Sequence, residues 1–110
     1  MPIEYARYSG IDDITFQISR EQTFKSVSSV ERSRILEDES YSAYQAAVTA
    51  RIKQQFPYGV SVHFQEGVLD HPAILIQGRR GEDFMHSLRE LCIDALVEIQ
   101  QDPSQWLRTK

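Results

Sequence analysis

The sequence has little cysteine and histidine and no long apolar run. Its single cysteine, Cys92, excludes an intrachain disulfide and a cysteine-based zinc cluster. No segment approaches the ~18 apolar residues that a membrane-spanning helix needs, and residues 1–10 lack the basic and apolar regions of a secretory signal. We therefore expect a protein of the reducing cytoplasm that has no membrane partner.

Basic charge is also scarce. The chain of 110 residues has 12 Lys and Arg against 16 Asp and Glu, which gives a net charge of −4. Because nucleic-acid binding relies on clustered Lys and Arg, this balance disfavours a dedicated nucleic-acid binder. The chain shows no linker, internal repeat or low-complexity segment, and its length suits one modest core. We expect a single domain over residues 1–110.

The N-terminal residues predict a strand or a hairpin. Apolar and polar residues alternate around Ile3 and Tyr5, and more regularly over residues 14–18. This alternation is typical of half-buried strands. Residues 9–13 supply turn chemistry between the two segments, which makes a hairpin the simplest arrangement.

The stretch 20–39 is rich in Ser, Arg and Glu and has no clear apolar period. Within it, Ser28 and Glu31 have the spacing of a capping box, which indicates a short helix over residues 30–36. We interpret residues 1–39, which include this stretch and the expected strand or hairpin, as an N-terminal extension of the domain.

Residues 40–56 predict an amphipathic helix. Its apolar residues recur at spacings of three and four, which places them on one helix face: Tyr41, Tyr44, Val48, Ile52 and Phe56. Pro57 ends the helix because the residue before a proline is disfavoured in the α region.

Two strands and a second helix are expected after this helix. Residues 60–65 alternate and residues 73–76 are apolar, and the short separation between the two segments favours an antiparallel hairpin. A helix over residues 82–101 would then bury its apolar face, made of Phe84, Leu88, Leu91, Cys92, Ala95 and Ile99. Pro103 ends this helix, and Trp106 and Leu107 are expected to fold back on the core.

The pattern predicts an α+β fold. The elements follow the order strand, helix, strand, strand, helix, with an extra strand expected at the N-terminus if the hairpin forms. The simplest packing is a sheet of three or four strands with both helices on one face.

The last helix carries an acidic stripe. Glu90, Asp94 and Glu98 are successive i,i+4 neighbours, with Asp83 above them and Val97 in the same sector. The stripe contains no Lys or Arg, although like charges at this spacing destabilise a helix by ~0.2–0.5 kcal/mol per pair. Either the stripe is an ordinary solvated face, or it is a binding surface.

Several junctions and element ends occur in the order of a known family: Arg51-Ile52, Phe56-Pro57, Val60-Ser61-Val62, Ile76, Gly78, Glu82-Asp83 and Trp106. Over residues 40–107 the chain resembles the DinI-like family, small bacterial and mobile-element proteins that modulate the RecA filament in the SOS response to DNA damage. The start of the chain, residues 1–4, also resembles the first strand of that family.

The resemblance implies a regulatory protein that binds RecA and catalyses nothing. The matching positions that transfer from the family are the outward acids, Glu90, Asp94, Glu98 and Asp102. In this interpretation the carboxylates imitate nucleic-acid phosphates or an acidic tail, and they dock on the basic groove of a DNA-binding protein.

Three features depart from the family pattern. Residues 5–39 are longer, residues 103–105 replace carboxylates before the tryptophan, and the tail 108–110 is basic. Because a new partner needs a new surface, these departures favour an alternative. The chain would then be a phage- or plasmid-encoded inhibitor or antirepressor that binds a different bacterial protein.

Residue patterns that carry catalysis are sparse. No two of His63, His71 and His86 have the i,i+4 spacing of metal ligands on a helix. Cys92 falls on an apolar helix face, which suits a small core residue better than a nucleophile. We expect no enzymatic activity, no metal and no cofactor.

Arg79 and Arg80 lie in the turn 78–81 and could pair with acids of a partner. A KH-like clamp joins two helices, whereas this turn joins a strand to a helix, so a solvated turn fits better. With Arg51 and Lys53 these arginines define a third hypothesis, direct nucleic-acid binding, which the net charge disfavours. An open sheet also leaves edges through which a homodimer could form.

Overall fold

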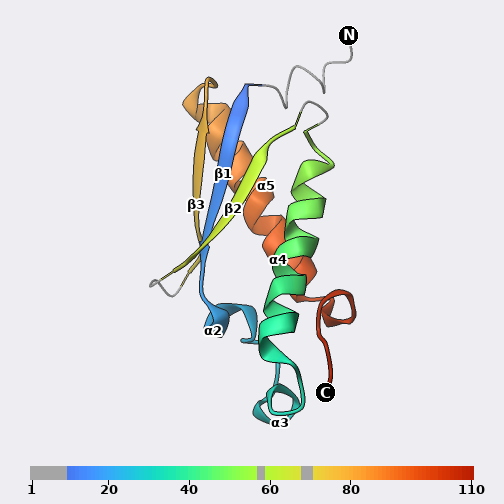
Figure 1. Cartoon of the computed structure of the whole chain (residues 1–110). Coiled ribbons are helices and arrows are strands. Elements are labelled where there is room, and N and C mark those ends of the chain that lie inside the picture. Colours follow the sequence, from blue (N-terminus) through green and yellow to red (C-terminus); the bar gives the residue numbers. More distant parts are fainter. Residues whose placement is uncertain (1–9, 57–58, 68–70) are drawn as a thin grey trace.

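The computed structural model describes residues 10–56, 59–67 and 71–110, and it has the α+β architecture that the sequence predicts. A three-stranded sheet forms one layer (Figure 1). The helices α4 (Glu37–Lys53) and α5 (Glu82–Gln100) form the second layer and run in opposite directions. One hydrophobic core lies between the two layers.

The strand β1 (Ile11–Ile18) lies at the centre of the sheet, between β2 (Ser61–Glu66) and β3 (Ala73–Gly78). It is parallel to β2 and antiparallel to β3. The predicted hairpin between the last two strands is therefore wrong, since β1 separates them. The crossover through α4 explains the parallel pair, because parallel strands need a long connection, usually a helix.

The central position of β1 also corrects two expectations about the N-terminus. Both sides of residues 13–17 pair with neighbouring strands, so this segment has no free edge for a hairpin with residues 3–5. Residues 3–5 themselves lie outside the described residues. Among the described residues, 11–18 are the first strand of the strand–helix–strand–strand–helix order.

Alternation along β1 separates a buried face from an open face. Ile14, Phe16 and Ile18 are 0–3% exposed and face the helices. The open face is mostly polar, although it also carries the exposed Leu75. On this face the His63 ring hydrogen-bonds to the Asp13 carboxylate at 3.0 Å, and the side chains of Gln17 and Gln65 hydrogen-bond to each other. This half-polar pattern is typical of a sheet with one face in solvent.

The two long helices bury the faces that their periodicity predicts. The apolar residues predicted for the first helix are buried. The helix begins at Glu37, three residues earlier than expected, with acids in its first turn. It ends at Lys53, three residues before the expected end, so Phe56 reaches the core from beyond the helix. In α5, Phe84 and Leu91 are half-buried, and Met85 and Leu96 join the core instead. Complete burial raises the pKa of the Cys92 thiol to about 12, which confirms it as a core residue.

The C-terminal residues return to the core, as predicted. Trp106 is fully buried and follows a 3₁₀ turn, η1 (Pro103–Gln105). Its ring packs edge-on against Tyr44, with 5.1 Å between the centroids. The tail then forms a β-bridge between Thr109 and Ile35, which fastens the end of the chain beside the start of α4.

Residues 20–39 contain two short helices, α2 (Arg20–Thr23) and α3 (Ser29–Arg32). The Ser28 cap is confirmed, since its hydroxyl oxygen accepts from the Glu31 backbone N–H at 3.1 Å. The predicted helix over residues 30–36 starts correctly but ends at residue 32, because the next residues pair with the C-terminal tail.

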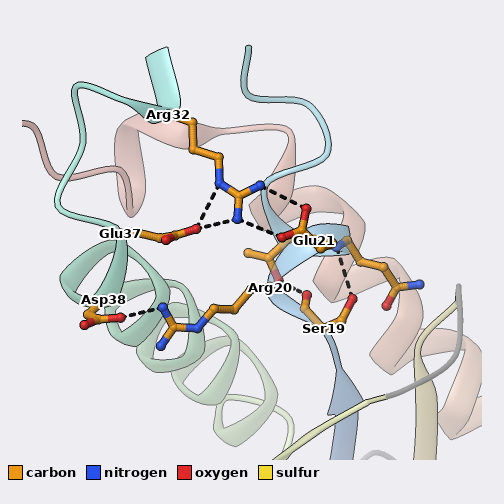
Figure 2. Close-up of polar contacts among 8 residues, drawn as sticks. Ser19, Arg20, Glu21, Arg32, Glu37 and Asp38 are labelled. Atoms are coloured by element: carbon orange, nitrogen blue, oxygen red, sulfur yellow. Dashed lines mark hydrogen bonds and ion pairs between the residues drawn. The ribbon is translucent and has the colours of Figure 1, made fainter. Parts of the chain in front are cut away.

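Two arginines hold this segment against α4 (Figure 2). The Arg32 guanidinium donates to both carboxylate oxygens of Glu21, at 3.0 Å each, and also to Glu37. Arg20 pairs with Asp38 in the first turn of α4. These ion pairs join the buried Phe24 and Ile35 in positioning α2 and α3.

Candidate protein-docking face

The predicted acids of α5 form one exposed row, which we call the acidic ridge and define as Glu90, Asp94 and Glu98. All three are exposed, with 68% of the Glu90 side chain and 59% of the Glu98 side chain accessible. Their i,i+4 spacing stacks them along three turns of one helix face. The structure thus brings together three of the four acids that the resemblance singled out.

The ridge acids differ in their local partners. Glu90 lies 3.2 Å from the His86 ring, one turn earlier on α5. Glu98 accepts a hydrogen bond from the Arg51 guanidinium at 3.0 Å. Asp94 forms no hydrogen bond or ion pair with any residue that the structure describes. The middle of the ridge is therefore the part most open to a partner's charge.

Arg51 also belongs to this face, whereas the sequence suggested it only for direct nucleic-acid binding. The stripe lacks Lys and Arg along α5, as predicted, but Arg51 reaches it from the last turn of α4. Because the two helices pack antiparallel, residues 47 positions apart meet. A helical wheel of one element cannot reveal such a contact.

A groove of about 380 Å³ runs between α4 and α5 beside the ridge. Its apolar lining consists of Ile52, Leu91 and Ala95. The polar lining includes all three ridge acids together with Arg51, Gln55 and Ser87. The groove therefore combines an apolar floor with an excess of negative charge.

Exposed aliphatic side chains border the ridge on its other side. Ile93 is 38% exposed and Val97 is 42% exposed, both on the outer surface of α5. At 100° per residue, these two side chains lie on one side of the acidic ridge around the helix axis, and the groove lies on the other side. A face that alternates apolar and acidic groups suits a folded protein surface better than a bare phosphate backbone.

Asp102 lies beyond the end of α5 and has a local role. Its two carboxylate oxygens accept hydrogen bonds from the Ser104 hydroxyl at 2.6 Å and the Gln105 amide at 2.8 Å. These bonds hold the pKa of Asp102 below its usual value. Its carboxylate therefore stabilises the turn before Trp106 and does not belong to the acidic ridge.

Arg79 and Arg80 lie at the opposite end of α5 from Glu98. Eighteen residues separate Arg80 from Glu98, which corresponds to about 27 Å along a helix. The turn is set by close backbone contact, since a Cβ at Gly78 would lie 2.5 Å from the Gly10 carbonyl oxygen. The Arg80 guanidinium lies 3.9 Å from the centroid of the Phe84 ring. The structure does not bring these arginines to the ridge.

The histidines lie apart from one another on different surfaces. His63 is on the open face of the sheet, His86 is on the outer face of α5, and His71 precedes β3. Within residues 10–56, 59–67 and 71–110, no three His, Cys, Asp or Glu side chains are grouped to hold a metal ion. No helix in this part of the chain is long and apolar enough to span a bilayer.

Comparisons with protein-family models, with curated proteins and with solved structures find no match to this chain. The DinI-like assignment accordingly rests on the sequence features that suggested it.

Proposed function

We propose that this chain is a non-catalytic regulatory protein that docks the acidic ridge of α5 on a basic surface of a DNA-processing protein. The observation that carries the proposal is the ridge itself. Three exposed carboxylates follow one another without a basic residue in their row, at the rim of a groove with an apolar floor. Packing does not require this arrangement, and repulsion between like charges opposes it.

The RecA filament is the partner that we propose first. The element order matches the one that the resemblance implies, and both long helices lie on one face of the sheet, which leaves the ridge exposed. Complementary fields would steer the encounter and make the binding sensitive to salt. Such a protein would act in the cytoplasm, where RecA filaments form during the response to DNA damage.

A second candidate is an inhibitor from a phage or plasmid that uses the same scaffold on another bacterial protein. The observation that favours it is the arm formed by α2 and α3, which Arg20 and Arg32 fix to α4. A second feature is the basic tail, which the Ile35–Thr109 bridge holds beside that arm. Phage or plasmid genes beside its gene would favour this candidate, and a lone gene under an SOS operator would favour the first.

A pull-down with RecA assembled on single-stranded DNA tests the proposal. The test variant neutralises the ridge through Glu90→Gln, Asp94→Asn and Glu98→Gln. A matched control, Asp12→Asn with Glu39→Gln and Glu66→Gln, removes the same charge from exposed acids elsewhere. We expect the control to bind like the wild type and the ridge variant to lose binding. Equal retention of both variants would refute the ridge as the docking surface, and no binding by the wild type would refute a RecA role.

A further inference from the structure

The groove between α4 and α5 already holds one guanidinium group, which belongs to this chain. Arg51 lies at its rim and pairs with Glu98 at 3.0 Å, whereas Glu90 and Asp94 make no contact with it. Among the described residues that line the groove, three carboxylates therefore face one basic group. The three carboxylates therefore attract more positive charge than Arg51 alone supplies.

We propose that the groove receives an arginine or lysine side chain from the protein partner, and that Arg51 competes with this side chain from within the chain. This inference rests on the proposed function, because it specifies what the docked surface must present. The occupant belongs to an amphipathic basic segment in which aliphatic residues flank the cation.

The lining explains this choice of occupant. The aliphatic stem of an arginine or lysine can lie on half-buried Leu91, above the buried Ile52 and Ala95, while its charged head stays at the wet rim. There it would meet the carboxylates of Glu90 and Asp94, which favour charge-assisted hydrogen bonds. A neutral apolar side chain would fill the same floor but leave these acids without a counter-charge. Ile93 and Val97, both exposed, offer contacts for the flanking aliphatic residues.

Arg51 is suited to give way when the partner arrives. Its side chain is 45% exposed and that of Glu98 is 59% exposed, so water can replace their contact easily. Exposed ion pairs of this kind contribute about 0.2–1 kcal/mol. Removing the charge of Arg51 should therefore strengthen the binding of a basic ligand by up to about fivefold.

A synthetic helix tests the groove without RecA. The probe is a fluorescein-labelled, alanine-rich peptide of about 14 residues, with arginine and leucine at i,i+4, and its comparison peptide carries glutamate in place of arginine. The protein variants are Arg51→Met, which keeps an aliphatic stem, and Lys53→Met, which removes the same charge from an exposed position of α4 outside the groove lining. Fluorescence anisotropy gives the dissociation constants, and thermal melting followed by circular dichroism checks that both variants fold.

We expect the wild type to prefer the arginine peptide, and Arg51→Met to bind it more tightly than Lys53→Met does, by up to about fivefold. Asp94→Asn should weaken the binding, whereas Asp12→Asn should not. Equal affinity for both peptides, no binding by the wild type, or no difference between Arg51→Met and Lys53→Met would overturn the proposal. If RecA binding fails while the peptide results hold, the groove remains and only the identity of the partner is wrong.

Discussion

Replacing Trp106 should test how far the C-terminal residues stabilise this fold. The side chain is 0% exposed and packs between Phe24, at 5.6 Å between centroids, and Tyr44, at 5.1 Å. Its indole N–H donates to the Ile99 carbonyl oxygen at 2.8 Å. The residue therefore joins the end of the chain to α4, to α5 and to the segment after α2.

The expected magnitude follows from burial. An aromatic side chain of this size buries ~150–250 Å², which corresponds to about 4–6 kcal/mol at ~25 cal/mol per Å². Since alanine retains part of that area, Trp106→Ala should lower the free energy of unfolding by about 4 kcal/mol. For Trp106→Phe we expect a loss of about 1–2 kcal/mol. The Ile99 carbonyl is not orphaned in either variant, because it also accepts from the Asp102 backbone N–H at 3.1 Å.

Urea unfolding followed by far-UV circular dichroism gives both values, and it is preferred because the chain has no other tryptophan to report by fluorescence. Trp106→Ala should also lower the melting temperature by roughly 15 °C. A loss below about 1 kcal/mol for Trp106→Ala would mean that the tail packs only loosely on the core. Equal losses for both variants would show that ring packing is not the main contribution.

Two further predictions concern titratable groups. The Cys92 thiol is buried and its pKa is raised. We therefore expect it to resist a thiol reagent at pH 8 in the folded protein and to react once the protein is unfolded in urea. Fast labelling of the native state would contradict this. The hydrogen bond from Arg32 lowers the pKa of Glu21, so this pair stabilises the fold above the unfolded-state pKa of Glu21, and the stabilisation disappears as pH falls through its folded-state value. The melting temperatures of the wild type and Glu21→Gln should therefore converge in acid, and an unchanged gap, or the same gap in an Arg32→Met background, would refute the pairing.

The two long helices, α4 and α5, were predictable from sequence because their information is local. The three- and four-residue spacing of Tyr41, Tyr44 and Val48 gives the buried face of α4 without knowledge of the rest of the fold. In the same way, the i,i+4 spacing of Glu90 and Asp94 gives one side of the docking face.

The order of the strands was not predictable in the same way, because pairing joins distant residues. Alternation shows which side of β1 is buried but not which strands lie beside it. Phe16 pairs with Phe64 on one side and with Ile74 on the other, from segments 48 and 58 positions away. Proximity in sequence favoured the hairpin of the last two strands, whereas β1 lies between them in the structure.

Two further features were not predictable from sequence because they depend on contacts made by long polar side chains. Arg32 bridges Glu21 and Glu37, and these ion pairs help to order the stretch 20–39 without leaving an apolar period in the sequence. Arg51 reaches Glu98 from another helix, which a wheel drawn for α5 cannot contain. In both cases the ion pair joins two different elements, and the residue pattern within a single element does not reveal it.

The most direct test of the acidic ridge is its effect on the salt dependence of RecA binding. Affinities of the wild type, the ridge-neutral variant and the matched control for RecA on single-stranded DNA would be measured by biolayer interferometry at low and high salt. We expect the ridge variant to bind about tenfold or more weakly at low salt and to depend less on salt than the other two proteins. If the matched control loses as much affinity as the ridge variant, or if neither loses any, the acidic ridge is not the docking surface.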